Sequence, residues 1–307
     1  MEIQNKPEVT VGIVTYNSSK TVIETLESIK AQTYDKLHLI VSDDCSTDNT
    51  IDICNQWIEK NADRFISTRV LTVSENTGVA GNSNRVWDAC QTEYYKGIAG
   101  DDCLIPDCVE TYVAYMESHP STVVVFGKVI CFGKRRYIKR YQSQFDYSFF
   151  DLSAQEQHSR LVNSSNCIPA GSTFIRIRRI RELNIRFDER IPLLEDWPMW
   201  IMLTGKGVKL EFLDKYTVRY RIGGNGLSSS GGAHSVKYYK SMLGFDLYYL
   251  FENEYNKDGD SAIESFIERQ AAYYQYMIRM MTKTSEYRLG KFLLAPWRYI
   301  EKLLKIK

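Results

Sequence analysis

The sequence has no long apolar run, no cysteine pair spaced for a metal site and almost no net charge. No stretch approaches the roughly 20 apolar residues that span a bilayer, and residues 1–7 are polar, unlike a secretory signal. The seven cysteines form no Cys-x-x-Cys pair, which argues against structural zinc and favours reduced thiols. Lys plus Arg is 39 and Asp plus Glu is 38, so no global field attracts nucleic acid. We therefore expect a cytoplasmic protein without a nucleic-acid partner.

Charge is spread unevenly along the 307 residues, although the total is +1. Residues 283–307 hold seven basic and two acidic side chains, mixed with Phe, Leu, Ile, Trp and Tyr. Such a composition suits a segment that lies in the interface of an anionic bilayer. Packing on the rest of the protein, with the lysines in water, is the alternative.

The first half alternates β-branched apolar segments with helical patterns. We expect strands at residues 9–15, 37–42, 70–73, 94–98 and 122–126, helices capped by Ser18 or Ser19 and by Ser46 or Thr47, a helix over 80–90, and a helix that begins at Pro106. Residues 127–188 are less regular, 205–218 predict a turn and a strand, and residues beyond 233 are aromatic-rich and helical in pattern. Repeated βα units predict an α/β fold with a mostly parallel, mixed sheet flanked by helices.

The first two polar motifs follow predicted strands. Thr15-Tyr16-Asn17 ends the first strand, where a dinucleotide-binding turn would need closely spaced glycines that are absent. Tyr16 offers a flat face to a base or closes the core. The second motif spans residues 42–48, in which the carboxylate of Asp44 suits a base or ribose, whereas capping is the better interpretation of Asp48.

Two acidic pairs follow further along the chain. Asp101-Asp102 comes after another strand, and carboxylates so close raise each other's proton affinity, a conflict that Mg²⁺ or Mn²⁺ on a nucleotide diphosphate resolves. A solvated turn is the alternative. Glu195-Asp196 stands among Leu and Trp, which desolvates the pair and suits a general base. The same segment also fits a helix start, with Pro198 in the first turn.

Small residues precede the second acidic pair. Residues 168–173 include Gly171 and Ser172, which suit the lining of a sugar pocket. Trp197 fits a platform for a sugar and a packing residue equally well, whereas core packing is the favoured interpretation of Trp200. We expect Gly171, Ser172, Glu195 and Trp197 on the acceptor side.

The order of these four motifs resembles the inverting family 2 glycosyltransferases of the GT-A fold, over about Val9 to Ser229. Residues 74–78, leading to Asn84, are similar to that family's Asn-x-Gly stretch, and Tyr220-Arg221 ahead of Ser228 is similar to its late donor-side loop. The resemblance implies these roles: Thr15, Tyr16, Asn17, Asp44, Asn76, Gly78 and Asp101 bind the donor nucleotide, Asp102 holds Mn²⁺ or Mg²⁺, Asp196 is the base, and Arg221 and Ser228 belong to the loop.

The resemblance further implies a metal-dependent, inverting transfer of a sugar from a UDP-sugar to a hydroxyl of a saccharide or lipid-linked saccharide in surface-polysaccharide biosynthesis. Residues 1–232 would form the catalytic domain, and residues 233–307 a helical region whose basic tail contacts the cytoplasmic face of the inner membrane. Three positions depart from the family pattern. Ala99 replaces a carboxylate, Ser83 replaces an arginine, and Gly223 or Gly224 replaces a histidine.

Two other functions fit parts of the pattern. A catalytically silent nucleotide- or carbohydrate-binding module would use the same strand ends without chemistry. A sugar-phosphate nucleotidyltransferase would share the architecture, but its glycine-rich, arginine-containing loop after the first strand is missing, because Val14-Thr15-Tyr16-Asn17-Ser18 stands there.

Overall fold

A computed structural model describes residues 6–134, 138–139, 142–164, 166–223, 241–242 and 244–251. The chain forms two compact units, Met1–Phe245 and Asp246–Lys307, and the described part of the second is the π-helix Asp246–Phe251. Most of the expected helical region, its basic tail, the expected boundary at 232 and Ser228 lie outside the described residues. None of the helices within the described ranges combines the length and apolar character needed to cross a membrane.

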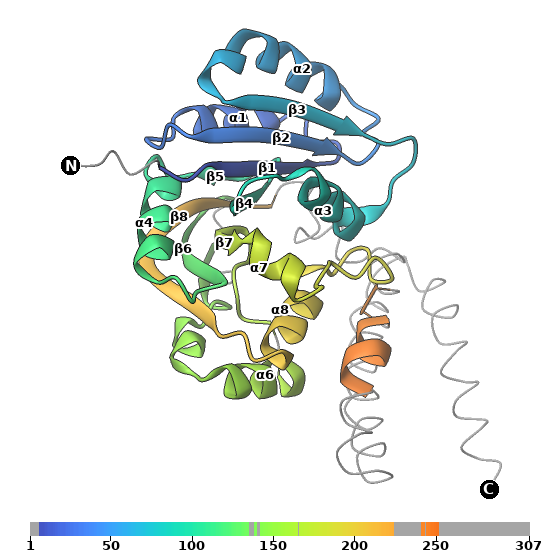
Figure 1. Cartoon of the computed structure of the whole chain (residues 1–307). Coiled ribbons are helices and arrows are strands. Elements are labelled where there is room, and N and C mark those ends of the chain that lie inside the picture. The colour runs from blue at the N-terminus through green and yellow to red at the C-terminus, as the bar shows by residue number, and fades with distance from the viewer. Residues whose placement is uncertain are drawn as a thin grey trace, which may run out of the picture. The chain divides into compact units, whose positions relative to one another are not determined.

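An eight-stranded sheet forms the centre of the first unit, in the order β3-β2-β1-β4-β7-β6-β8-β5 (Figure 1). β1 is parallel to β2 and β4, β2 to β3, and β6 to β8, whereas β7 runs antiparallel to both β4 and β6, and β5 to β8. This arrangement confirms the expected mixed sheet. The strands are β1 Val9–Thr15, β2 Leu37–Asp43, β3 Ser67–Thr72, β4 Tyr94–Ala99, β5 Cys103–Leu104, β6 Val124–Gly133, β7 Thr173–Arg176 and β8 Leu210–Ile222.

The α-helices follow the expected pattern, but two begin later than their predicted caps. They are α1 Val22–Lys30, α2 Thr50–Asn61, α3 Gly78–Ala89, α4 Cys108–Ser118, α6 Ala154–Asn163, α7 Ile177–Glu182 and α8 Asp196–Gly205. Neither α1 nor α2 has a side-chain cap from its N-cap residue, so the capping predictions for Ser18, Ser19, Ser46 and Thr47 are wrong. At α2, the Ser46 hydroxyl bonds Asp43 and the Thr47 hydroxyl bonds Asn17, while Asp48 accepts the backbone N–H of Thr50 at 3.0 Å.

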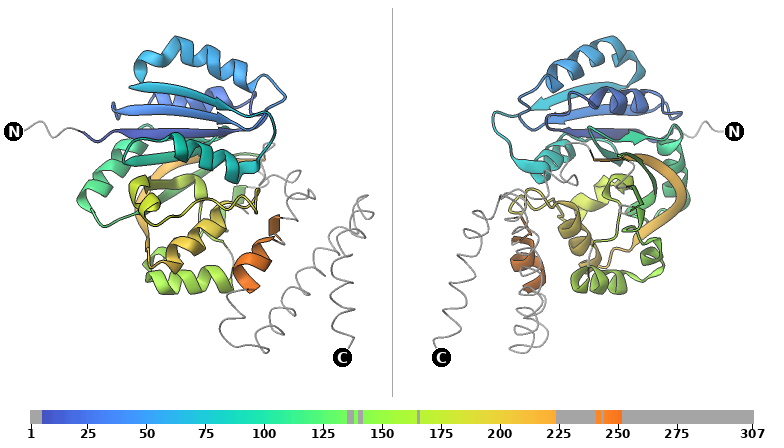
Figure 2. Two further views of the ribbon diagram at one scale, coloured as in Figure 1. Left: turned by 45° about the vertical axis from the view of Figure 1, so that its right-hand side comes forward. Right: turned by 180° about the vertical axis from the view of Figure 1, so that it is seen from behind.

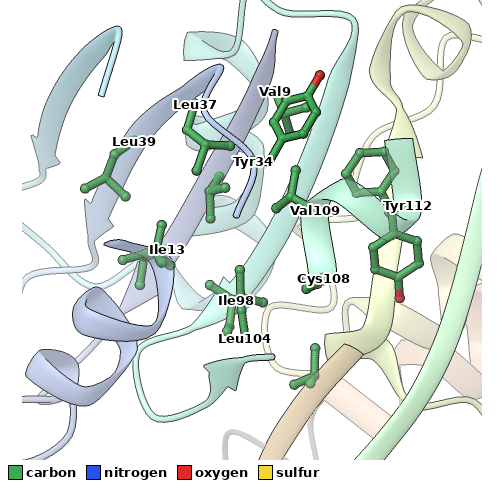
Figure 3. Close-up of a cluster of buried hydrophobic side chains, with 14 of the residues drawn as sticks. Val9, Ile13, Tyr34, Leu37, Leu39, Ile98, Leu104, Cys108, Val109 and Tyr112 are labelled. Atoms are coloured by element: carbon green, nitrogen blue, oxygen red, sulfur yellow. The ribbon is translucent and has the colours of Figure 1, made fainter. Parts of the chain in front are cut away.

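Each face of the sheet has its own helices. The view from behind in Figure 2 brings α1 to the front, whereas α3 lies in front in Figure 1. Alternate residues of β1, Val9, Val11 and Ile13, point into the larger core with residues of α1, α2 and α4, part of which Figure 3 shows. Gly12 points the other way, where a Cβ atom would lie 2.4 Å from Val86 of α3. The close approach of α3 to β1 therefore needs a glycine at this position.

The less regular middle contains short elements that complete the sheet and its second face. The 3₁₀ helix η2, Tyr147–Asp151, precedes α6, which begins with a capping box between Ser153 and Glu156. The 3₁₀ helix η3, Ala170–Ser172, leads directly into β7. α6 packs against α8. These elements bring residues 166–173 beside the start of α8.

Candidate functional site

The carboxyl ends of parallel strands gather the first three motifs at one edge of the sheet. Thr15 of β1 is in register with Asp43 of β2, and Val14 with Ala99 of β4. The turns are joined as well, since the Asp44 N–H donates to the Thr15 carbonyl and the Gly100 N–H to the Val14 carbonyl, both at 3.0 Å. The motifs thus lie where the βα rule places ligand groups, which is at the carboxyl ends of the parallel strands of an α/β sheet.

The first turn is held by polar contacts that leave Tyr16 exposed. The Thr15 hydroxyl donates to Asp43 at 2.8 Å. Asn17 adopts a positive φ of 52°, donates its N–H to the Ser46 hydroxyl at 2.7 Å and accepts the Thr47 N–H on its side-chain oxygen at 2.8 Å. The side chain of Tyr16 is half-exposed next to the strand ends. Its ring is therefore accessible for stacking, whereas Thr15 and Asn17 fix the turn.

Asp44 is buried and its carboxylate is already bonded by the protein. One oxygen accepts the Thr77 N–H at 3.0 Å, the Thr77 hydroxyl at 2.6 Å and an Arg85 guanidinium N–H at 2.9 Å. The other accepts the Gly78 N–H at 2.7 Å. Asn76 donates its side-chain amide to the Asp44 carbonyl at 3.1 Å. Asp44 thus organises the start of α3.

Gly78 joins this network to the segment before Asp196. Its φ is +85°, and a Cβ atom there would lie 2.5 Å from the Pro192 Cβ and 2.6 Å from the Pro192 carbonyl oxygen. The Ala80 N–H donates to the same carbonyl at 3.3 Å. Further along α3, Asn84 donates to the Phe187 carbonyl at 2.9 Å and accepts the Phe187 N–H at 3.0 Å. The N-terminal half of α3 therefore holds residues 187–192.

The Asp101–Asp102 pair lies in the turn between β4 and β5. Asp102 is 2% exposed, and one of its carboxylate oxygens accepts the Arg221 N–H at 2.7 Å. Arg221 also donates its guanidinium to the Asp101 carbonyl and pairs with Glu24 of α1. Burial raises the pKa of Asp102 well above its ordinary range, and the charge of Asp101 raises it further. Burial likewise raises the pKa of Asp101, which Arg221 opposes. Additional positive charge beside these two carboxyl groups would therefore favour their ionised forms.

Glu195 and Asp196 stand at the start of α8. Asp196 accepts the Trp197 N–H on one oxygen and the Asn166 side-chain amide on the other, both at 2.7 Å. Burial raises the pKa of Asp196, and these two hydrogen bonds lower it. Burial, with the charge of Asp196, raises the pKa of Glu195 to about 8. Pro198 lies in the first turn of the helix as expected. The two adjacent acids therefore have different surroundings, because Asp196 has donors from two other residues, whereas the hydrogen bond that reaches Glu195 comes from its own backbone.

One cavity of about 200 Å³ is lined by Asp102 and by both acids of the second pair. Its lining includes Asp102, Gly171, Glu195, Asp196, Trp200 and Tyr220. Gly171 keeps space beside Asp102, since a Cβ atom at this position would lie 3.4 Å from an Asp102 carboxylate oxygen. The cavity lining thus combines three acidic side chains with a glycine that lies beside one of them.

Two residues expected on the acceptor side are placed elsewhere. Ser172 is fully buried, and its hydroxyl donates to the Pro169 carbonyl at 2.8 Å. The Trp197 indole N–H donates to the Leu161 carbonyl at 2.9 Å, and its ring packs 4.4 Å from that of Phe245. These contacts favour the packing alternative for Trp197. Trp200, for which packing was favoured, both lines the cavity and packs on Phe126.

Three polar residues of the site were not predicted. Arg85 bonds Asp44 two positions after Ser83, where the family pattern has its arginine. Asn166 bonds Asp196 from a segment 30 residues away in the chain. Lys96 of β4 is fully buried and donates its ammonium to the Gly171 carbonyl at 2.6 Å. A lysine within an otherwise apolar strand was a signal that could have been found, because such residues are rarely buried without a partner.

Comparisons with known proteins agree with this architecture. WfaP of Escherichia coli, named as a UDP-Glc:alpha-D-GlcNAc-diphosphoundecaprenol beta-1,3-glucosyltransferase, is 23% identical over 228 residues, covering 72% of this chain and 80% of WfaP. EpsE of Bacillus subtilis is 32% identical over 126 residues, which cover 41% of this chain and only 44% of EpsE.

Solved structures of S. aureus TarS share the fold. The complex of TarS 1–349 with UDP-GlcNAc superposes with a TM-score of 0.60 at 19% identity, covering 78% of this chain and 66% of that one. The complex with UDP gives a TM-score of 0.54 at 21% identity, covering 70% and 61%. The likeness confirms the expected GT-A fold. A model of the family described as glycosyl transferase family 2 matches residues 10–180, more than half of the sequence. The chain belongs to glycosyl transferase family 2.

Proposed function

We propose that this chain transfers a sugar from a UDP-sugar to a hydroxyl group of a saccharide or lipid-linked saccharide, with inversion at the anomeric carbon. The observation that carries the proposal is the single cavity that Asp102 and Asp196 both line. An inverting transfer needs a base on the acceptor side and charge stabilisation at the leaving diphosphate. One cavity with an acidic group for each task supports this chemistry.

The donor nucleotide would occupy the edge formed by the ends of β1, β2 and β4. The exposed ring of Tyr16 supports stacking on uracil. Asp44 would contribute mainly by holding the start of α3, since four protein donors already reach its carboxylate. Asp101 would reach the ribose, with Thr15, Asn17, Asn76 and Gly78 shaping the site, and Ser228, which lies outside the described residues, stays a prediction for the donor-side loop. The nucleotides in the two TarS complexes support a UDP-linked donor.

The residues at Asp102 fit a divalent cation, Mn²⁺ or Mg²⁺. Its carboxylate supplies hard oxygen ligands, and the glycine at 171 leaves space beside one of them. Within the described ranges, no group of three or more His, Cys, Asp or Glu residues is placed to hold a metal unaided. Diphosphate oxygens and water would complete the ligand set. Bound there, the cation would neutralise the charge that grows on the leaving diphosphate.

Asp196 would act as the general base. Two hydrogen bonds hold its carboxylate, so it would accept the proton of the acceptor hydroxyl as that oxygen attacks the anomeric carbon in line. Glu195 would bind the acceptor from the same wall, and Gly171 would give it room. Trp197 and Ser172, packed away from the cavity, would act through the shape of this wall.

The acceptor class is proposed as a saccharide or lipid-linked saccharide of surface-polysaccharide biosynthesis. The similarity to WfaP, which is named for a diphosphoundecaprenol-linked acceptor and of which 80% is covered, supports a diphosphate-lipid acceptor. Such an acceptor would place the enzyme at the cytoplasmic face of the membrane, where residues 283–307 would bind anionic lipid. Truncation near Ser285 should then abolish sedimentation with anionic liposomes. Sedimentation equal to that of the full chain would contradict this part.

A catalytically silent nucleotide- or carbohydrate-binding module is the second candidate, and one assay separates the two. UDP release is measured across a panel of UDP-sugars with Mn²⁺ or Mg²⁺. We expect release from at least one donor, whereas the module predicts none.

Asp196→Asn should lower turnover by about 10²- to 10⁴-fold while keeping UDP affinity, and near-normal turnover would refute the role of Asp196 as the base. Asp102→Asn should abolish metal-dependent UDP binding in calorimetry, and unchanged affinity would refute its role. Asp52→Asn, on an exposed face of α2, is the control.

A further inference from the structure

We propose that Asn166 is a positioning residue for Asp196. Its side-chain amide holds one oxygen of the carboxylate while the Trp197 N–H holds the other, so that Asp196 faces the cavity in one orientation. The inference rests on the proposed function, in which Asp196 removes the acceptor proton. It concerns a residue that neither the motifs nor the family resemblance points to.

The orientation of the Asn166 amide follows from its two hydrogen bonds. Its side-chain oxygen accepts the Ile168 N–H at 3.1 Å, within its own turn. A backbone N–H can only donate, so the oxygen must face Ile168 and the NH₂ group must face Asp196, which it reaches at 2.7 Å. A flipped amide would put an NH₂ group against an N–H and an oxygen against a carboxylate. The donor to Asp196 is therefore assigned without ambiguity.

The segment that carries Asn166 is held independently of Asp196. The next residue, Cys167, is 9% exposed, and its carbonyl accepts the Asp146 N–H at 3.3 Å. Ile168 is 4% exposed. The second donor is anchored too, because the Trp197 indole bonds the Leu161 carbonyl at 2.9 Å. Both donors are thus in place before any substrate arrives, which is what a preorganised base requires.

The charge around Asp196 explains why such a donor is needed. Glu195 precedes it, Asp102 lines the same cavity, and Tyr95 and Tyr220 contribute phenol groups to the lining. His158 of α6, the helix that packs on α8, bonds Thr204 about two turns further along α8. Acidic and desolvated surroundings favour the protonated, inactive form of an aspartate. The hydrogen bonds from Asn166 and Trp197 reach the carboxylate and oppose this effect, together with a bond from the backbone of Asp196 itself, and Asn166 is the side chain among these donors.

The test compares the acid limb of the pH–rate profile among single variants. Donor hydrolysis is followed as UDP release from the UDP-sugar that the wild type cleaves fastest, and kcat/KM is measured against pH. Asn166→Ala should move the acid limb upward by about one pH unit, because a hydrogen bond to a charged group is lost. Asn166→Asp should move it further, since a like charge is added. At pH values above the acid limb, turnover should persist, whereas a folding defect would lower turnover at every pH.

The control makes the same chemical change three residues away. Asn163→Asp alters an exposed residue at the end of α6 whose amide bonds Ser159, and it should leave the limb unchanged. UDP affinity from calorimetry reports folding, and Asn166→Ser replaces any variant that fails to bind UDP. Unshifted limbs in Asn166 variants that bind UDP normally would overturn the inference.

The turnover of Asp196→Asn distinguishes failure of the proposed base from failure of the positioning role alone. If this variant keeps its turnover, the proposed base is wrong and Asn166 has nothing to position. If it is inactive and the Asn166 variants keep the wild-type acid limb, the proposed function stands and the positioning role alone fails.

Discussion

Two glycines with nearly the same backbone conformation offer a measurement of how tightly α3 is packed against the base-bearing segment. Gly78 has a φ of +85° and Gly207 a φ of +78°. A Cβ atom at Gly78 would lie 2.5 Å from the Pro192 Cβ, whereas nothing lies within 4 Å of one at Gly207. Replacing each by alanine therefore adds the same backbone strain at both positions and a steric clash at only one.

The expected magnitudes follow from these two terms. A left-handed conformation costs a residue with a Cβ atom about 1–2 kcal/mol, and this cost is common to both variants. Carbon atoms in contact prefer a separation of about 3.5–4.0 Å, so the Cβ atom at position 78 overlaps Pro192 by about 1 Å. Forcing such an extra methyl into a packed site costs about 1–3 kcal/mol. Gly207→Ala should thus lose about 1–2 kcal/mol and Gly78→Ala about 2–5 kcal/mol.

Urea denaturation gives the free energy of unfolding of each variant, and UDP release gives its activity. Because Pro192 lies three residues before Glu195 in the sequence, a displaced Pro192 should also lower turnover in Gly78→Ala. Gly207→Ala should keep wild-type turnover. Equal losses of stability in the two variants, within about 0.5 kcal/mol, would show that the Pro192 contact does not constrain the fold.

Two further predictions concern buried charges. Asp44→Asn should destabilise the protein by about 2–4 kcal/mol in urea denaturation, because it sets an NH₂ group against bound donors and removes the carboxylate that pairs with Arg85. The control Asp52→Asn should cost at most about 1 kcal/mol, and an equal loss in both would contradict the buried network. Burial lowers the pKa of Lys96 from 10.5 to about 8, so the unfolded chain binds this proton more tightly. As the pH rises from about 8 to 10.5, the free energy of unfolding of the wild type should increase by about 1–3 kcal/mol relative to that of Lys96→Met, and a difference that does not change with pH would refute the lowered pKa of Lys96.

Long, regular elements were predictable from the sequence, and short ones were not. The strand at residues 9–15 has the predicted bounds, because all its residues except Gly12 are β-branched. β7 was missed: its four residues lie between η3 and the arginine-rich α7, too short a span for any period to show. It pairs antiparallel with β4 and β6, which are separated from it by dozens of residues. Such pairing depends on tertiary structure rather than on local pattern.

The site divides in the same way. Residues directly after parallel strands, such as Asp44 and Asp102, were predictable because the βα rule places them at one edge. The partners of these carboxylates were not. Arg85 bonds Asp44 across 41 residues, Arg221 bonds Asp102 across 119, and Asn166 bonds Asp196 across 30. Two of these partners are side chains and the third, Arg221, donates its backbone N–H, and the importance of each comes only from what the fold brings next to it.

The contacts of α3 explain how a donor edge and a base that are far apart in sequence keep one geometry. The N–H of its first residue, Gly78, donates to Asp44, and the Gly78 backbone lies directly against Pro192. About two turns along, the Asn84 side chain forms hydrogen bonds with both the N–H and the carbonyl of Phe187. The ring of Phe187 packs 4.4 Å from that of Trp87. A helix is stiff over this length, so displacement of one end carries the other with it. The separation between the proposed nucleotide site and Asp196 is therefore set by α3, which gives its many buried polar contacts a functional reason.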